Sequence, residues 1–161
     1  MFAMFILALL QFCLGLGRHD ITTAFEGRVA ATAQEMLHRH NWMVPYCNGV
    51  PRVVKPPLPY WAVMSAWSIG GTIDVALARL PSAFLGALAI VLVMDLTRRT
   101  LGRRAGFFAG LVWLSTWFIA SEYRKAMADP YLAFFTLLSV WLWVVAEQTA
   151  HRGLKKRGLA R

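Results

Sequence analysis

The segment Val54-Lys55-Pro56-Pro57 holds a lysine on stiff, extended backbone just before an apolar stretch of the chain. Proline fixes φ, lacks an N–H and pushes the residue before it out of the α region. An ammonium held in this way beside a bilayer can bind a lipid-linked phosphate or pyrophosphate. The same lysine can also serve only as an anchor, with its stem in the apolar layer and its charge in water. The residues alone leave both interpretations open.

The apolar runs around this lysine predict an integral membrane protein. The chain has 161 residues, of which 58% are hydrophobic, and a net charge of +9. Four long runs lack charged side chains, and each has roughly 15 to 20 residues, near the length that crosses about 30 Å of hydrocarbon. We therefore predict an all-α membrane fold with four transmembrane helices, at residues 1–17, 78–97, 105–121 and 130–147.

The basic residues predict the orientation of these helices. Short segments rich in Arg and Lys beside helix ends remain in the cytoplasm. The turn at residues 98–104 contains four arginines, and the tail after Ala150 carries Arg152, Lys155, Lys156, Arg157 and Arg161. We therefore predict a multi-pass plasma (inner) membrane protein with a cytoplasmic C-terminal tail. The long loop at residues 18–77 would face the periplasm or the exterior.

This outer loop is expected to carry two interfacial amphipathic helices. One apolar face runs from Phe25 to Leu37 and predicts a helix that begins near Thr22 or Thr23. Pro59 suits the first turn of a second helix, from Tyr60 to about residue 70, which is too short to span and would lie flat on the membrane. Prolines and Asn48-Gly49 would break the chain between the two helices into turns.

The cysteines and histidines do not predict a disulfide or a metal site. Cys13 lies in the first apolar run and Cys47 in the outer loop, so the two are not expected to meet. His38 and His40 are two residues apart, which places them on different faces of a helix.

Seven short motifs follow one another along the chain at spacings typical of one family. They are Glu26-Gly27-Arg28, Gln34-Glu35-Met36-Leu37, Asn41-Trp42-Met43-Val44-Pro45, Asn48-Gly49, Lys55-Pro56-Pro57-Leu58-Pro59-Tyr60-Trp61, Ala78-Arg79-Leu80-Pro81-Ser82-Ala83 and Asp129-Pro130. Together they resemble the N-terminal part of the GT-C glycosyltransferases, in the branch of the protein O-mannosyltransferases and the aminoarabinose transferase of lipid A.

The resemblance implies a membrane enzyme that passes a sugar from a polyprenyl-phosphate carrier to a lipid or protein acceptor on the non-cytoplasmic face. A carboxylate would take a proton from the acceptor, and fixed cations would stabilise the leaving phosphate. The candidate catalytic acids are Glu26, Asp129 and Asp20. The candidate ligands of the donor phosphate are Lys55, Arg28, Arg79 and Arg124. Membrane lipids are further expected partners, and nucleic acid is not.

Two residues depart from the family pattern. The family usually has an Asp-Glu pair followed, one residue on, by Arg, whereas this chain has Phe25-Glu26-Gly27-Arg28. The usual catalytic acid is therefore replaced by phenylalanine, and Glu26 or Asp20 would have to substitute for it. Some members place a metal-ligating Glu before the Lys-Pro, where this chain has Val54. We assign no metal ligand, although the resemblance leaves a divalent metal open as a cofactor.

Several candidate residues also have structural interpretations. Thr23 and Glu26 have the spacing of a capping box, in which Glu26 would bond back to the Thr23 N–H. Asp129 before Pro130 suits a helix N-cap, and Arg79 could be an interfacial anchor.

The family's enzymes continue past the length of this chain with further spans. Residues 1–161 therefore read as one N-terminal module: the front of a longer protein, a shortened reading frame, or half of a split enzyme whose partner chain supplies the missing helices. The alternative function is a catalytically inactive membrane protein that binds lipid phosphate or assembles with a partner subunit. A small transporter or channel subunit is disfavoured, because no predicted span has a charged residue near its centre.

Overall fold

The computed structural model describes residues 1–21 and 23–156, with the backbone alone for residues 152–156. Its elements in chain order are α1 (Phe2–Cys13), α2 (Ala24–His38), β1 (Tyr46–Cys47), β2 (Val50–Pro51), α3 (Leu58–Gly70), α4 (Val75–Leu101), α5 (Arg103–Ser115), α6 (Trp117–Glu122) and α7 (Asp129–Lys156). The basic tail falls partly outside this description, as does Thr22.

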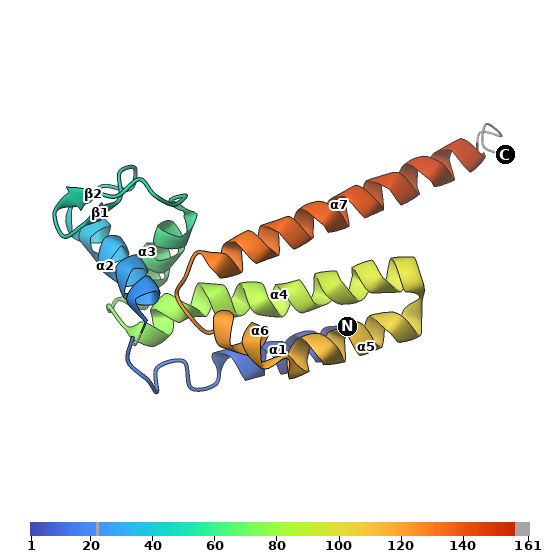
Figure 1. Cartoon of the computed structure of the whole chain (residues 1–161), viewed down its shortest axis with the longest axis horizontal. Coiled ribbons are helices and arrows are strands. Elements are labelled where there is room, and N and C mark those ends of the chain that lie inside the picture. Colours follow the sequence, from blue (N-terminus) through green and yellow to red (C-terminus); the bar gives the residue numbers. More distant parts are fainter. Residues whose placement is uncertain (22, 157–161) are drawn as a thin grey trace.

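Helix α4 is the central element of the fold and contacts α1, α3, α5 and α7 (Figure 1). Asp74 caps its N-terminus, because the Asp74 carboxylate accepts the N–H groups of Ala76 and Leu77 at 2.8 and 3.2 Å. Helices α1, α5 and α6 lie along one side of α4, and α7 diverges from it on the other side. Because α4 touches both groups, residues on α4 can connect parts of the chain that are far apart in sequence.

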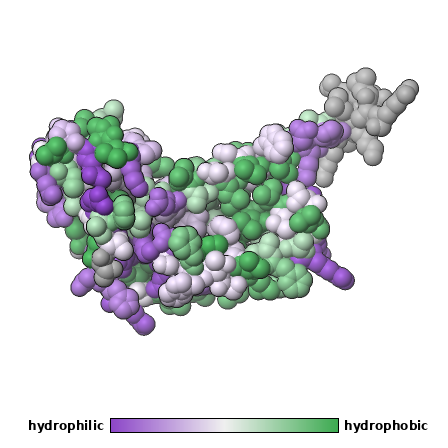
Figure 2. All heavy atoms as spheres, viewed as in Figure 1, coloured by the Kyte–Doolittle hydropathy of each residue, from purple (hydrophilic) through white to green (hydrophobic). Residues whose placement is uncertain are grey.

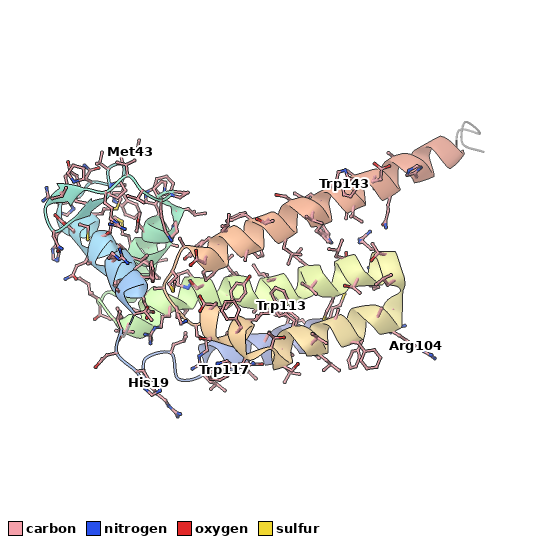
Figure 3. The ribbon with its side chains drawn as sticks, in the orientation of Figure 1. His19, Met43, Arg104, Trp113, Trp117 and Trp143 are labelled. Atoms are coloured by element: carbon pink, nitrogen blue, oxygen red, sulfur yellow. The ribbon has the colours of Figure 1, made fainter. Side chains whose placement is uncertain are left out.

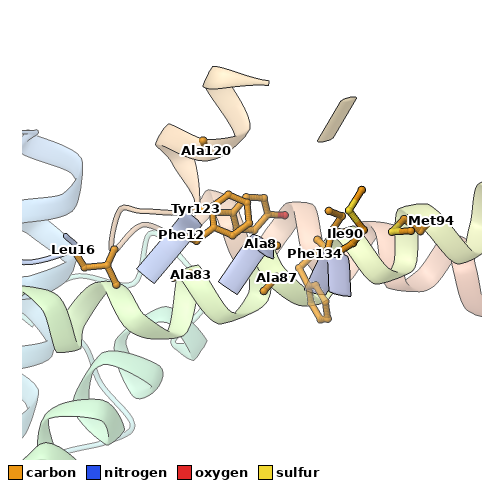
Figure 4. Close-up of a cluster of buried hydrophobic side chains, with 12 residues drawn as sticks. Ala8, Phe12, Leu16, Ala83, Ala87, Ile90, Met94, Ala120, Tyr123 and Phe134 are labelled. Atoms are coloured by element: carbon orange, nitrogen blue, oxygen red, sulfur yellow. The ribbon is translucent and has the colours of Figure 1, made fainter. Parts of the chain in front are cut away.

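Small residues on α4 let its neighbours approach closely and form the main core (Figure 4). Ala83 and Ala87 are fully buried there, beside Phe12 of α1 and Tyr123, whose ring centroids lie 5.9 Å apart. Gly86 is required at this contact, since a Cβ atom on it would fall 2.7 Å from the Tyr123 ring. The core therefore joins α1, α4 and the segment that precedes α7.

The prediction of four transmembrane helices is confirmed only in part. Helix α4 and the Asp129–His151 stretch of α7 are long and apolar enough to cross a membrane. Helices α1 and α5 have 12 and 13 residues, roughly 18 and 20 Å at 1.5 Å per residue, which is less than the hydrocarbon thickness of about 30 Å. All four predicted positions are helical, but two of them are shorter than a full span.

The predicted helix at residues 105–121 is divided in two, which corrects the sequence-based boundary. Helix α5 ends at Ser115, Thr116 is extended, and α6 begins at Trp117. The Thr116 hydroxyl donates to the Val112 carbonyl at 2.6 Å. Serine and threonine hydroxyls that bond to the preceding turn compete with regular helical hydrogen bonding, and this accounts for the break.

Residues 23–71 form a separate unit at one end of α4, which we call the head. Helices α2 and α3 occur close to the predicted positions, and α3 ends where Gly71 takes a left-handed φ of 69°. The pair of strands β1 and β2 was not predicted and corrects the all-α assignment. Asn48 and Gly49 turn between these strands with φ values of 55° and 79°, the conformation of a tight hairpin turn.

The two head helices pack against each other, with Val29, Ala33 and Met36 facing Val63 and Met64. Hydrophilic residues gather on the head and at the turn between α4 and α5, whereas apolar and weakly polar residues cover the helical body between them (Figure 2). That α2 and α3 lie at the membrane interface remains a prediction.

Candidate functional site

The seven candidate site residues fall into two clusters around the linker at residues 123–128, between α6 and α7. We call the first the Lys55 cluster, and it contains Lys55, Arg28 and Asp129. We call the second the Glu26 cluster, and it contains Glu26, Arg79, Asp20 and Arg124. The structure therefore separates residues that the sequence grouped in one site.

Lys55 and Asp129 form the centre of the first cluster. The Lys55 ammonium lies 3.8 Å from Oδ1 of Asp129, and 36% and 58% of the two side chains are exposed. An ion pair this exposed contributes on the order of 0–1 kcal/mol to stability. Neither side chain is therefore locked by the other, and both can turn to a ligand.

Phe25, at the position where the family usually has an acid, contacts the side chain of Arg28. The Arg28 guanidinium lies 4.7 Å from the centroid of the Phe25 ring, within the range of a cation–π contact. Arg28 Nε donates to the Ala24 carbonyl at 2.9 Å. In the described part of the chain, the terminal nitrogens of Arg28 have no hydrogen-bonded partner, so they can bind an anion.

Arg52 is a third cation in this cluster that the sequence analysis did not select. It lines a narrow pocket of about 20 Å³ together with Phe25, Arg28, Lys55 and Tyr60. Its N–H donates to the Pro45 carbonyl at 2.7 Å, which fixes the backbone after β2. The available signal was its position between Pro51 and Pro56, in the same stiff segment as Lys55.

An apolar groove of about 460 Å³ opens beside Lys55 and Asp129. It runs between the Pro56–Pro59 segment and the first two turns of α7, where Tyr131, Leu132 and Phe135 line it. Lys55 lines both this groove and the narrow cationic pocket. The arrangement places positive charge beside an apolar groove, which suits an amphiphile with an anionic head and a hydrocarbon tail.

Glu26 and Arg79 form a buried ion pair at the centre of the second cluster. Glu26 is 1% and Arg79 is 7% exposed. Arg79 donates to both carboxylate oxygens of Glu26, at 2.7 and 2.9 Å. It also donates to the carbonyls of Leu16, His19 and Asp20. All five N–H donors of the guanidinium are therefore used within the protein.

These bonds differ from the roles expected of both residues. Arg79 has no donor left for a phosphate, because all five are bonded within the protein. Thr23 Oγ1 accepts the Glu26 N–H at 3.3 Å, so one half of the capping box forms. The Glu26 carboxylate does not return to Thr23, because Oε1 accepts the Ala126 N–H at 2.9 Å in addition to Arg79. Glu26 therefore ties α2 to α4 and to the linker that leads to Asp129.

Asp20 and Arg124 lie on a different pocket from Lys55. This pocket of about 550 Å³ is also lined by His19, Thr23 and Trp117, and His19 and Trp117 lie on the same side of the molecule in Figure 3. Arg124 donates to the carbonyls of Gln11 and Leu14 at 3.1 and 2.6 Å. Arg124 therefore holds the end of α1, and the Asp20 carboxylate is not brought to Lys55.

The described residues do not form a metal site. Across residues 1–21 and 23–156, no three His, Cys, Asp or Glu side chains lie close enough to hold an ion together. Val54, at the position where some family members have a ligating Glu, is 71% exposed.

The sequence of this chain is similar to one protein family and to curated glycosyltransferases. The family model described as dolichyl-phosphate-mannose-protein mannosyltransferase matches residues 54–156. An undecaprenyl phosphate-alpha-4-amino-4-deoxy-L-arabinose arabinosyl transferase of Pseudomonas savastanoi pv. phaseolicola is 30% identical over 133 residues, which is 82% of this chain and 25% of that protein. A transferase of the same name from Yersinia enterocolitica is 35% identical over 73% of this chain and 20% of that protein.

The solved structures agree with this similarity. ArnT from Cupriavidus metallidurans, crystallised with undecaprenyl phosphate, superposes with a TM-score of 0.80 at 26% identity, over 89% of this chain and 26% of that one. The chain thus spans about a quarter of the length of the relatives it matches. Because the family model covers well over half of the chain and the fold agrees, the chain belongs to the dolichyl-phosphate-mannose-protein mannosyltransferase family of GT-C glycosyltransferases and is similar to its aminoarabinose transferases.

Proposed function

We propose that this chain is the donor-binding module of a membrane glycosyltransferase that moves a sugar from a polyprenyl-phosphate carrier to a lipid or protein acceptor on the non-cytoplasmic face. The observation that carries the proposal is that Lys55 lines both the narrow cationic pocket and the apolar groove beside α7.

The charges of the Lys55 cluster suit a phosphate leaving group. Three cations, Lys55, Arg28 and Arg52, line one pocket that has room for about one water, so the phosphate would meet them at its surface. Asp129 is the acid paired with Lys55. Negative charge grows on the carrier phosphate as the sugar leaves, and fixed cations stabilise that charge most where it develops. The planar fork of an arginine can also bind two phosphate oxygens at once.

The groove suits the polyprenyl chain. Leu132 and Phe135 are 70% and 44% exposed on the first turns of α7, and α7 continues as a helix long enough to span a membrane. A polyprenyl chain that lies along this face would bury its own apolar surface and that of α7, away from water and lipid headgroups. The phosphate, at the end of the polyprenyl chain, would then lie at Lys55.

Asp129 is the acid best placed to act on an acceptor. Glu26 is buried and accepts bonds from Arg79 and Ala126, and Asp20 lies on the other pocket. Asp129 is exposed within 3.8 Å of the Lys55 ammonium, so its carboxylate can take a proton from an acceptor that approaches the bound donor. In this proposal Glu26 and Arg79 position the linker, and Asp129 acts as the base.

The test of binding compares undecaprenyl phosphate with undecaprenol, which has the same tail without the phosphate. The chain is placed in lipid nanodiscs, and the retained ligand is measured by native mass spectrometry. We expect retention of the phosphate form alone and its loss in Lys55→Ala. Lys125→Ala is the matched control, because Lys125 is paired with Glu122 away from this pocket. Equal retention of both lipids, or equal losses in the two variants, would contradict the proposal.

The test of chemistry separates an enzyme from a lipid-phosphate-binding protein without catalysis. Membranes that contain the chain are supplied with a radiolabelled polyprenyl-phosphate sugar, and labelled acceptor is counted. We expect transfer that Asp129→Asn abolishes while undecaprenyl phosphate is still retained. Transfer that is unchanged in Asp129→Asn would remove Asp129 from the mechanism.

A further inference from the structure

A second cationic pocket lies at the end of the bundle opposite the head. The turn between α4 and α5 brings together Arg98, Arg99, Arg103 and Arg104, and Figure 1 places this turn at the far end of α4 from α2 and α3. A pocket of about 680 Å³ lies here, lined by Met1, Met94, Arg98, Arg103, Gly106 and Phe107. It is separate from both clusters described above.

The arginines of this turn are not equivalent. Asp95 accepts bonds from Arg98 at 2.5 Å and from Arg99 at 2.5 Å, so one carboxylate is shared between two guanidinium groups. Among the side chains of residues 1–21 and 23–151, Arg103 and Arg104 have no hydrogen-bonded or ion-paired partner. Arg103 lines the pocket, whereas Arg104 does not. The labelled Arg104 points away from the bundle in Figure 3.

The other walls of the pocket are apolar or bare backbone. Met94 and Phe107 contribute side chains, and Phe107 is half exposed. A Cβ atom on Gly106 would fall 2.7 Å from the Met94 carbonyl oxygen, so the glycine is what lets α5 approach α4 at this point. Helix α5 also begins here with no side chain capping its first N–H groups, which adds to the positive field of the arginines.

We propose that this pocket binds the phosphate of an anionic membrane phospholipid. The phosphate would bind Arg103 and the exposed part of Arg98, and the acyl chains would follow Phe107 along the outside of the bundle. A lipid is favoured over a free phosphate because α4, which ends at this turn, is long enough to span a membrane and because apolar side chains form part of the wall. Basic pockets at helix ends bind anionic headgroups in this way.

The experiment compares two adjacent arginines that differ in contact with the pocket. The full chain is placed in nanodiscs of equal phosphatidylglycerol and phosphatidylcholine, and the lipids that remain bound are weighed by native mass spectrometry. We expect Arg103→Gln to lower phosphatidylglycerol retention about tenfold or more, because it removes a hydrogen bond to the charged phosphate. Arg104→Gln makes the same change in charge and is expected to retain the lipid as the unchanged chain does.

Three further measurements test the proposal: the lipid preference of the unchanged chain, a conservative variant, and competition by a free phosphate. The unchanged chain should retain phosphatidylglycerol over phosphatidylcholine, a measurement that does not depend on the folding of any variant. Arg103→Lys should restore most of the retention, and excess glycerol phosphate should not displace the lipid. Equal retention of the two lipids, equal losses in Arg103→Gln and Arg104→Gln, or displacement by glycerol phosphate would each overturn the proposal. Because the Lys55 cluster is not involved, the result is independent of the proposed transferase function.

Discussion

At the scale of single residues, charge in this protein is used in two ways. The buried Glu26–Arg79 pair has every donor satisfied within the protein and therefore holds structure. The exposed Lys55–Asp129 pair is loosely joined at 3.8 Å and can exchange its partner for a ligand. Burial, rather than residue type, thus separates the positioning residues from the candidate binding residues.

Arg52 is expected to share the binding of the carrier phosphate with Lys55. Arg52→Gln should weaken the retention of undecaprenyl phosphate by about tenfold or more, because a hydrogen bond to a charged group contributes about 1.5–3 kcal/mol. The measurement is a titration of the lipid into nanodiscs that contain each variant. Arg39→Gln is the control, since Arg39 is in the same head but pairs with Glu35 at 2.7 Å. Equal affinities in both variants would place Arg52 outside the site.

Glu26 is expected to matter for stability. Glu26→Gln leaves the Arg79 guanidinium buried without its counter-charge, which typically costs about 3–5 kcal/mol. The free energy of unfolding can be followed by tryptophan fluorescence in mixed micelles of increasing denaturing detergent. Glu147→Gln, in an exposed pair with His151, should change stability little. The double variant Glu26→Gln/Arg79→Gln should lose less than the sum of its single variants, because the two groups are in contact; additive losses would argue against a coupled pair.

At the scale of elements, the linker at residues 123–128 determines where α7 begins. Tyr123 packs on Gly86 of α4, Arg124 binds the end of α1, and the Ala126 N–H binds Glu26 of α2. Three separate helices thus fix six residues of irregular backbone. Asp129 follows directly, so its position beside Lys55 is set by contacts made by its neighbours in the chain.

Gly86→Ala should therefore disturb the linker. A Cβ atom there would lie 2.7 Å from the Tyr123 ring, and such overpacking costs about 1–3 kcal/mol. Gly27→Ala is the matched control, because its Cβ would meet Ile21 at an ordinary 3.6 Å. The gain in helix propensity should leave that variant equally or more stable. Thermal unfolding in one detergent compares the two, and equal midpoints would mean that Tyr123 moves aside freely.

At the scale of the whole molecule, the two proposed anion sites lie at opposite ends of α4. The head carries the Lys55 cluster, and the turn between α4 and α5 carries the pocket of Arg103. If α4 spans the bilayer, each site meets a different leaflet. The chain corresponds to about a quarter of its relatives, and this quarter already contains a cationic pocket, an apolar groove and an exposed acid.

Because the head and the turn between α4 and α5 lie at opposite ends of α4, cysteines at the two places should differ in their labelling by a thiol reagent. Cys47 lies in the head hairpin and is a free, half-buried thiol, so a membrane-impermeant maleimide should label it in intact cells. Replacing both Cys13 and Cys47 with alanine and adding Arg104→Cys should give a chain that is labelled only after the cells are permeabilised. Labelling of Arg104→Cys in intact cells would reverse or disprove the orientation predicted from the basic turn.

The sequence by itself determined the class of the protein and the local elements. Long uncharged runs, the Lys-Pro-Pro segment and the order of motifs predicted helices in a membrane protein of the correct family, because hydropathy and backbone restriction act over neighbouring residues. The tertiary structure decided which charged residues meet. Arg79 and Glu26 are 53 residues apart and bind each other, whereas Glu26 and Arg28, two residues apart, serve different pockets. Such partners depend on how α2, α4 and the linker pack, and that packing is not encoded in any local pattern.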